Sequence, residues 1–325
     1  MKTIAIIATG GTIAGTGQNG KTVGYHAGEI SVDDILQSIP GIHEVSRIRT
    51  FQLCNLDSNE MNKEIWMQLS NTINSLVLDE DIDGIVVTHG TDLIEETSYY
   101  LTLTLNTNKP VVITGAMRPD TATSADGPFN LYQAVNLACS DKARGKGVMV
   151  LFSNTIFSGR DVQKVNNFKI DAFGQKASGC LGYMQDEEVY FFSESFKKHT
   201  SNSVFAGNYT TLPDVGIAYF YGGVDSSILY HLAEKNEGIV LVGSGSGNYS
   251  QAWLNAINDL SEKGIVFVRS SRVSEGIVFS DKVFDPNEYC VASNTLSGQK
   301  ARILLMLALK KTKNREDIKR IFNEY

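Results

Sequence analysis

The chain has 325 residues, of which 42% are hydrophobic and 20% are charged, as in an ordinary globular protein. This composition excludes a mainly disordered chain, and the length favours two domains or one large α/β unit. The net charge of −7 has the wrong sign for a protein whose main partner is nucleic acid or an anionic membrane surface. No apolar run approaches the roughly 20 residues that a membrane-spanning helix requires.

The amino-terminal residues lead directly into an apolar run and contain no cleavage site of small residues, so the chain as written is expected in the cytoplasm. A mature chain with an added Met1 would look the same, which leaves a periplasmic or secreted location open. The cysteines have neither metal-type spacing nor the density of a disulfide scaffold. We therefore expect buried free thiols at Cys54, Cys139, Cys180 and Cys290.

Short β-branched runs alternate with segments of helical period, a pattern typical of βαβ units on a parallel sheet. Continuous apolar runs in the first half of the chain predict buried strands at 4–8, 84–88, 110–114 and 147–152. Helices are predicted at 62–78, 93–105 and 128–138. The first helix has a predicted apolar face made of Ile65, Leu69, Thr72, Ile73 and Leu76.

The pattern changes near residue 192, where a polar stretch rich in Ser, Thr and Asn indicates a linker. Alternation then resumes, with strands predicted at 215–220, 238–242 and 264–269 and helices at 227–235, 251–263 and 299–309. We expect an α/β fold of two domains. The larger, over residues 1–193, is built on a parallel sheet; a linker over 194–213 leads to a smaller flavodoxin- or Rossmann-like α/β domain over 214–325.

The first predicted strand is followed by Gly10, Gly11 and Thr12, at the edge where open parallel sheets bind ligands. Adjacent glycines allow a sharp turn that brings backbone N–H groups close to a bound atom, and Thr12 adds a hydroxyl to that turn. A nucleotide-binding loop is the alternative, although the G-x-G-x-x-G pattern and the lysine of a Walker loop are both missing. Spacing alone leaves both interpretations open.

The next segment, residues 15–28, is dense in glycine and contains Tyr25 and His26. Glycine at this density predicts a mobile loop, and a mobile loop beside a catalytic turn would act as a lid. Tyr25 could then take part in proton transfer. A disordered surface loop explains the same segment equally well.

Two later strand ends also carry polar side chains. Thr91 and Asp92 follow the strand at 84–88, where a hydroxyl stands directly before a carboxylate. Asp92 would equally suit the first turn of the following helix, because the helix dipole favours an anion there. Lys164 follows another strand end, although an exposed lysine is usually only solvated.

These segments together resemble the bacterial type II L-asparaginases: ATGGTIAG at 8–15, THGTD at 88–92, GAMRP…SADGPFNLY at 115–132, SSRV at 270–273 and QKARILLMLAL at 299–309. The resemblance extends from Thr3 nearly to Tyr325. It implies a two-domain α/β enzyme, usually a homotetramer built as a dimer of dimers. Such an enzyme hydrolyses L-asparagine to L-aspartate and ammonia and uses no metal or other cofactor.

The resemblance also implies roles for individual residues. Thr12 matches the family's nucleophile and Tyr25 its lid tyrosine, while a second catalytic cluster is matched by Thr91, Asp92 and Lys164. The α-carboxylate and α-amine of the substrate would be held by Ser58, Asn59 and Asp92. Backbone N–H groups at Gly11 and beside Ala116 would stabilise the oxyanion. Asn248 matches a residue that enters the site from a neighbouring subunit.

Two departures from the family pattern stand out. Asn59 replaces the usual Gln or Glu, which shortens that side chain by one carbon. The glutamate that the family supplies from a partner subunit should lie near residues 281–285, where this chain has no Glu. The alternatives are that Asp281 or Asp285 substitutes for it, and that this chain lacks the corresponding interaction with Tyr25.

Three functions follow as alternatives. The first is an amidohydrolase that acts on L-asparagine through an ester on Thr12. The second is a glutaminase-asparaginase, because L-glutamine differs by one methylene, although Asn59 and Asn248 favour asparagine. The third is an amino-acid-binding protein without turnover, which would need the substrate contacts but not the two hydroxyls, the tyrosine and the lysine.

Overall fold

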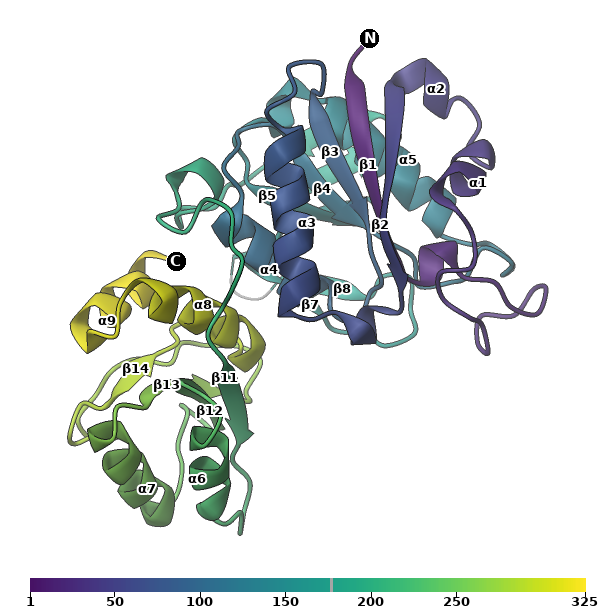
Figure 1. The fold of residues 1–325 in the computed structure, drawn as a ribbon. Helices are drawn as coiled ribbons and strands as arrows, with labels where there is room; N and C mark the ends of the chain where they lie inside the picture. Colours follow the sequence, from purple (N-terminus) through teal and green to yellow (C-terminus); the bar gives the residue numbers. More distant parts are fainter. Residues whose placement is uncertain (176–177) are drawn as a thin grey trace. The chain divides into compact units, whose positions relative to one another are not determined.

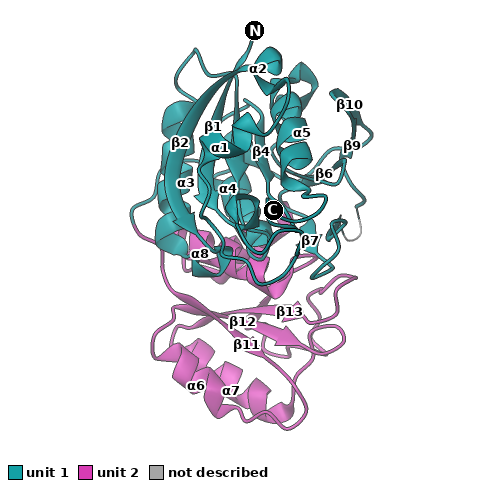
Figure 2. Cartoon of the chain, turned by 90° about the vertical axis from the view of Figure 1, so that its right-hand side faces the viewer, with its two compact units in different colours: residues 1–210 teal, residues 211–325 magenta. Residues whose placement is uncertain are grey.

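The computed structural model describes residues 1–175 and 178–325, and the chain forms two compact units over residues 1–210 and 211–325 (Figure 2). Unit 1 contains a large sheet that is mainly parallel, and unit 2 contains a separate parallel sheet. The α/β class is therefore as predicted. No helix in the described part of the chain is long and apolar enough to span a membrane.

Unit 1 is built on an eight-stranded sheet that is parallel through its centre and antiparallel at one end (Figure 1). The central strands are buried on both faces, which is why their sequences are continuous apolar runs. In sheet order the strands are β10 (Glu188–Phe191), β9 (Gly182–Gln185), β6 (Thr155–Ser158), β5 (Val148–Phe152), β4 (Val111–Thr114), β3 (Gly84–Thr88), β1 (Thr3–Gly10) and β2 (Arg47–Leu56).

The predicted strands are confirmed as β1, β3, β4 and β5, whereas β2 and the antiparallel strands were not predicted. β2 is an edge strand whose residues alternate between exposed and half-buried, so it lacks a continuous apolar run. A separate antiparallel pair, β7 (Val162–Lys164) and β8 (Phe173–Gln175), carries the predicted site residue Lys164.

Helices cover both faces of this sheet: Figure 1 shows α3 and α5 on opposite sides of it. The helices of unit 1 are α1 (Val32–Gln37), α2 (Ile42–Val45), α3 (Lys63–Leu76), α4 (Ile94–Thr104) and α5 (Gly127–Cys139). Short 3₁₀ turns are η1 (Thr12–Ala14), η2 (Ser58–Glu60), η3 (Asp141–Ala143) and η4 (Thr200–Asn202).

The three predicted helices are confirmed as α3, α4 and α5, but the predicted face of α3 is rotated. Leu69 and Ile73 are fully buried as expected, whereas Ile65, Thr72 and Leu76 are only half-buried. The buried face instead includes Trp66, because its indole N–H finds a hydrogen-bond acceptor on α4.

Residues 194–210, most of the predicted linker, lie within unit 1. The side chain of Phe205 is fully buried, and the Asn71 amide donates a 2.9 Å hydrogen bond to the backbone oxygen of Tyr209. This polar segment is therefore hydrogen-bonded to α3 and is not an extended linker.

Unit 2 is a four-stranded parallel sheet in sequential order with its own hydrophobic core. Its strands are β11 (Val215–Tyr219), β12 (Gly238–Gly243), β13 (Val266–Ser271) and β14 (Cys290–Ala292), and its helices are α6 (Ser227–Ala233), α7 (Gln251–Glu262), α8 (Gly298–Lys311) and α9 (Arg315–Glu324). The predicted strands and helices of this half are confirmed. β14 and α9 were not predicted.

All the cysteines are free, as expected, but only Cys290 is fully buried. Its burial raises the pKa of its thiol to about 12. Cys54, Cys139 and Cys180 are half-buried, so the prediction of buried thiols was wrong for these three.

Candidate active site

The site begins where the parallel neighbours β1 and β3 end at the same edge of the sheet. The Thr9 hydroxyl donates a 2.9 Å hydrogen bond to the backbone oxygen of Thr88 and so joins the two strand ends. Gly11 has a φ of 82°, and a Cβ there would lie 2.4 Å from the backbone nitrogen of Gly90. Only glycine fits this close approach, so the turn after β1 is pressed against the loop after β3.

Thr12 follows this turn as the first residue of η1, and it is 7% exposed. Its Oγ1 lies 2.8 Å from the Tyr25 hydroxyl. Tyr25 is carried by the glycine-rich segment, which is closed by paired backbone hydrogen bonds between Thr16 and His26 and joined to Thr121 by a 3.0 Å bond from the Gly17 N–H. This framework holds the tyrosine directly beside the threonine.

A second hydroxyl lies at the end of β3. Lys164 Nζ donates a 2.8 Å hydrogen bond to Thr91 Oγ1 and forms an ion pair with Asp92 at 2.5 Å. The alternative role of Asp92, as a cap of the following helix, is not observed: Leu93 is the N-cap of α4, and no side chain caps it. Lys164 in turn is fixed by its backbone N–H, which donates a 3.0 Å bond to the buried carboxylate of Glu95.

Ser58 joins these two strand ends to the loop after β2. It is buried at the start of η2, and its Oγ accepts a 3.2 Å hydrogen bond from the Asp92 N–H. Asn59, next in the chain, is exposed, and its N–H bonds the side chain of Asp57. Ser58 is thus part of the floor of the site.

A cavity of about 390 Å³ connects these groups. It is lined by predicted residues from both hydroxyl clusters, namely Gly11, Thr12, Tyr25, Ser58, Thr91, Asp92 and Lys164. Lining residues that were not predicted are Thr22, Val23, Asp57, Gly90, Met117, Arg118, Asn167 and Phe168. Asn59 and Ala116 are absent from the described lining.

Ala116 belongs to the loop that follows β4 and is fully buried. That loop is fixed by Asp126, whose carboxylate accepts hydrogen bonds from the N–H groups of Met117 at 3.0 Å and Arg118 at 2.9 Å. The position of Met117 and Arg118 in the cavity wall therefore depends on a carboxylate outside it. No group of three or more His, Cys, Asp or Glu side chains in the described residues is arranged to hold a metal ion.

Comparison with known proteins places this arrangement in a family. The sequence model described as "Asparaginase, N-terminal" matches residues 3–197, and "Glutaminase/Asparaginase C-terminal domain" matches residues 214–322. The chain belongs to the asparaginase family. It is 42% identical to L-asparaginase 2 of Bacillus subtilis, over 99% of this chain and 86% of that protein.

Two further relatives show the range of the family. The chain is 39% identical to a glutaminase-asparaginase of Pseudomonas fluorescens biotype A, over 99% of this chain and 90% of that protein. A crystal structure described as a probable cytoplasmic L-asparaginase from Campylobacter jejuni has a TM-score of 0.96 and 42% identity, and the match covers 100% of both chains.

The remaining predicted residue of this asparaginase, Asn248, lies in unit 2. It is exposed in the loop after β12, and its backbone N–H and carbonyl bond the backbone of Ser244 at 2.7 and 3.0 Å. The Arg269 guanidinium donates a 2.7 Å bond to the Ser246 backbone oxygen and so fixes the same turn. Asn248 therefore lies in a loop that these hydrogen bonds hold in place, and it is exposed to solvent.

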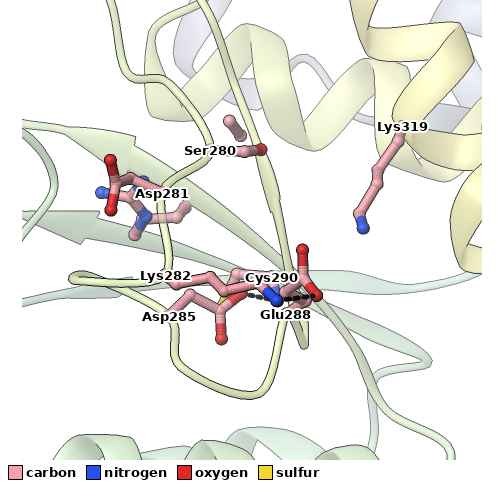
Figure 3. Close-up of a pocket in the computed structure, with 9 residues that line it drawn as sticks. Ser280, Asp281, Lys282, Asp285, Glu288, Cys290 and Lys319 are labelled. Atoms are coloured by element: carbon pink, nitrogen blue, oxygen red, sulfur yellow. Dashed lines mark hydrogen bonds and ion pairs between the residues drawn. The ribbon is translucent and has the colours of Figure 1, made fainter.

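The two acidic candidates for the family's partner-subunit glutamate differ sharply in environment (Figure 3). Asp285 is 6% exposed, and its carboxylate accepts hydrogen bonds from the N–H groups of Tyr289 at 3.0 Å and Cys290 at 2.7 Å. Asp281 is exposed and accepts one bond, 2.7 Å long, from the Val283 N–H. Asp285 is thus committed to its own loop, and Asp281 is accessible.

Sequence reasoning missed two buried residues behind the second cluster. Glu95 has an acidic neighbour at Glu96 in the first turn of α4, so nothing in the sequence distinguishes its buried position. His89 lies within the THGTD motif but is completely buried, and this burial lowers its pKa to about 4. The only sign of its burial in the sequence is that this histidine directly follows an apolar strand.

Proposed function

We propose that this asparaginase family member converts L-asparagine and water to L-aspartate and ammonia, with Thr12 as the nucleophile. One observation carries the proposal: two hydroxyls, each hydrogen-bonded to a proton-transferring partner, line the same cavity of about 390 Å³. Amide hydrolysis through a covalent ester needs one activated hydroxyl and one proton relay to the leaving nitrogen. The family's named relatives are L-asparaginases and glutaminase-asparaginases.

In the first step, Thr12 Oγ1 bonds to the side-chain carbonyl carbon of the substrate and the bond from that carbon to nitrogen breaks. Thr12 releases one proton, and the leaving nitrogen takes up one to depart as ammonia. Tyr25, whose hydroxyl lies 2.8 Å from Thr12, is positioned to accept the first of these protons while its own hydroxyl hydrogen passes to solvent. Backbone N–H groups at Gly11 and beside Ala116 would stabilise the oxyanion, at about 3 kcal/mol per donor.

The second cluster supplies the proton relay. Lys164 donates to Thr91 Oγ1, so the Thr91 hydrogen is directed away from Lys164 and can be donated to the leaving nitrogen. Lys164 then returns a proton to Thr91, and the Asp92 carboxylate holds the lysine in place throughout. In the second step the same proton transfers run in reverse. The water that cleaves the ester gives a proton to Thr91, and Thr91 passes one to the neutral amine of Lys164.

Substrate orientation is proposed to depend on charge. The exposed Asp92 carboxylate suits the α-amine, while Ser58 and Asn59 suit the α-carboxylate.

Asn248 is proposed to complete a neighbouring subunit's site within a homotetramer. Asp281 is proposed to replace the partner-subunit glutamate, because the Asp285 carboxylate is already used in hydrogen bonds inside its own loop. Asp281→Asn should then lower kcat without lowering the thermal midpoint, whereas Asp285→Asn should lower the midpoint.

An acid-quenched digest after mixing with L-asparagine tests the nucleophile. We expect a β-aspartyl mass increment on the peptide that contains Thr12. An increment on the Thr91 peptide would exchange the two roles, and no ammonia release at all would favour a binding protein without turnover.

Substantial hydrolysis of L-glutamine is the second candidate, supported by the glutaminase-asparaginase relative. One methylene changes binding by about 1–3 kcal/mol in a tight pocket, so the preference is measurable as a ratio of the two kcat/KM values. A ratio well above about 10 in favour of asparagine supports the first candidate, and a ratio near one supports the second.

The similarity to a structure described as cytoplasmic supports a proposed cytoplasmic location. Fractionation of the native host with an antibody against the chain tests this, because a periplasmic pool would contradict it. The homotetramer is tested by sedimentation, together with the loss of specific activity on dilution that a site shared between subunits requires.

A further inference from the structure

We propose that three buried side chains, Trp66, Thr97 and His89, form a one-way hydrogen-bond relay that positions the Thr91 peptide for catalysis. In this proposal only the catalytic role of Thr91 rests on the proposed function. The direction of the hydrogen bonds and the tautomer of His89 are argued from geometry alone. None of the three side chains lines the cavity among its described residues.

The direction of the relay follows from donor inventory. The Trp66 indole Nε1 can only donate, and it lies 2.9 Å from Thr97 Oγ1, so Thr97 accepts. Thr97 Oγ1 is also 2.9 Å from His89 Nε2, and its own hydrogen is available for that bond. At the other side of the ring, His89 Nδ1 lies 2.7 Å from the backbone oxygen of Gly90, which can only accept.

These contacts are mutually consistent for a single arrangement. Because the Gly90 oxygen accepts, His89 must carry its hydrogen on Nδ1, and a neutral ring then leaves Nε2 as the acceptor for Thr97. Every polar atom of the three side chains then has its partner. Since Trp66, Thr97 and His89 are each at most 2% exposed, water cannot substitute for a missing partner.

The end of the relay is one peptide bond from the site. The Gly90 carbonyl belongs to the planar amide that joins Gly90 to Thr91, so fixing the oxygen fixes the direction of the Thr91 N–H and the position of its Cα. The Thr91 side chain leaves that Cα toward Lys164. Gly90 is free of side-chain restraint, which makes an external restraint on this peptide effective.

The role of Thr97 in the relay can be separated by experiment from its role in core packing. A second pair of α3 and α4 side chains repeats the same contact without a histidine: Ser70 Oγ donates a 3.0 Å bond to Thr104 Oγ1, and both residues are buried. Thr104→Val is therefore a matched control for Thr97→Val, since each leaves one α3 donor without its acceptor.

The first experiment measures kcat and KM for L-asparagine in Thr97→Val, Thr97→Ser and Thr104→Val. We expect Thr97→Val to lower kcat by about tenfold or more with KM within about twofold, because a mispositioned catalytic group costs turnover more than binding. Thr97→Ser should restore kcat, and Thr104→Val should keep it. Equal losses of kcat in both valine variants would overturn the proposal.

The second experiment uses side chains that imitate one ring nitrogen each. In His89→Asn, the shorter side chain places its amide nitrogen near the position of Nδ1, where it can still donate to Gly90. In His89→Gln, the longer side chain carries its amide to the position of Nε2 instead. We expect His89→Asn to retain several-fold more kcat than His89→Gln, and the reverse order would contradict the relay.

The tautomer itself is read from ring-nitrogen shifts of ¹⁵N-histidine-labelled protein, with His89 assigned by the loss of its signals in His89→Asn. We expect a neutral ring protonated at Nδ1 in the wild type, and a loss of that single tautomer in Thr97→Val. Protonation at Nε2 in the wild type would overturn the relay even if Thr12 and Lys164 prove catalytic. If His89 is protonated at Nδ1 but Thr91 and Lys164 prove not to be catalytic, the proposed function is disproved instead.

Discussion

The two hydroxyl clusters of the cavity are built in different ways. Thr12 and Tyr25 are 13 residues apart, on a glycine turn and the loop that follows it. Thr91 and Lys164 are 73 residues apart, and they meet only because α4, the β7–β8 hairpin and the end of β3 pack together. The first cluster depends on local backbone shape, and the second depends on buried anchors such as Glu95.

This difference predicts how each cluster responds to change. A local cluster loses function when its own side chains are altered, and its surroundings matter less. A cluster assembled from distant elements should also be sensitive to buried residues that never touch substrate, so variants of Glu95 and His89 test the comparison directly.

The largest effect is expected for Thr12→Ala. Removing the proposed nucleophile should lower kcat by about 10³-fold or more, because the proposed ester on Thr12 can no longer form. Binding of L-aspartate, measured by calorimetry, should stay within a few-fold of wild type. Near-normal ammonia release would reject Thr12 as the nucleophile, and Thr121→Val provides a control in the same region for general damage to the loop.

A loss of about 10²–10³-fold in kcat is expected for Lys164→Met, which keeps the approximate length of the side chain but removes the proposed proton relay to Thr91. Lys142→Met is a control outside the cavity, since the Lys142 ammonium bonds only a backbone oxygen of β10 in the described contacts. If Lys164→Met and Lys142→Met turned over substrate equally well, the second cluster would have no catalytic role.

His89 should make stability depend on pH. Its pKa is about 4 in the folded protein against an ordinary 6.5, so between these values the unfolded chain binds more protons and stability falls as pH falls. The full effect is roughly 3 kcal/mol at about 1.36 kcal/mol per pH unit. We expect the advantage in thermal midpoint of wild type over His89→Asn to shrink from about pH 7.5 to about pH 4.5. A constant difference across that range would show that His89 does not titrate as its burial requires.

The smallest effect is expected for Glu95→Gln, which keeps an acceptor for the Lys164 N–H but weakens it by removing the charge. We expect kcat to fall by roughly 3- to 10-fold with little change in KM. Glu96→Gln, one residue further along α4, is the control. A larger loss in Glu96→Gln would contradict the anchoring role of Glu95.

Much of the fold could be predicted because the central strands carry their own signal. GIVVT at 84–88 is buried on both faces and is almost entirely apolar, and the predicted range equals β3. β2 could not be predicted in the same way, because an edge strand mixes Arg, Gln and Asn with apolar residues. The rotated face of α3 has a similar cause: Trp66 is buried through a hydrogen bond to another helix, which no helical periodicity reports.

The sequence by itself determined which residue types follow each strand and that glycine stands at the turn before Thr12, where close backbone approach leaves room for no side chain. Only the tertiary structure decided that Asp92 pairs with Lys164 and does not cap α4, that Asp285 is held inside its own loop, and that His89 faces Thr97 and the Gly90 carbonyl. The reason is that hydrogen bonds and ion pairs between distant segments depend on where packing brings their atoms, and burial then removes water as an alternative partner.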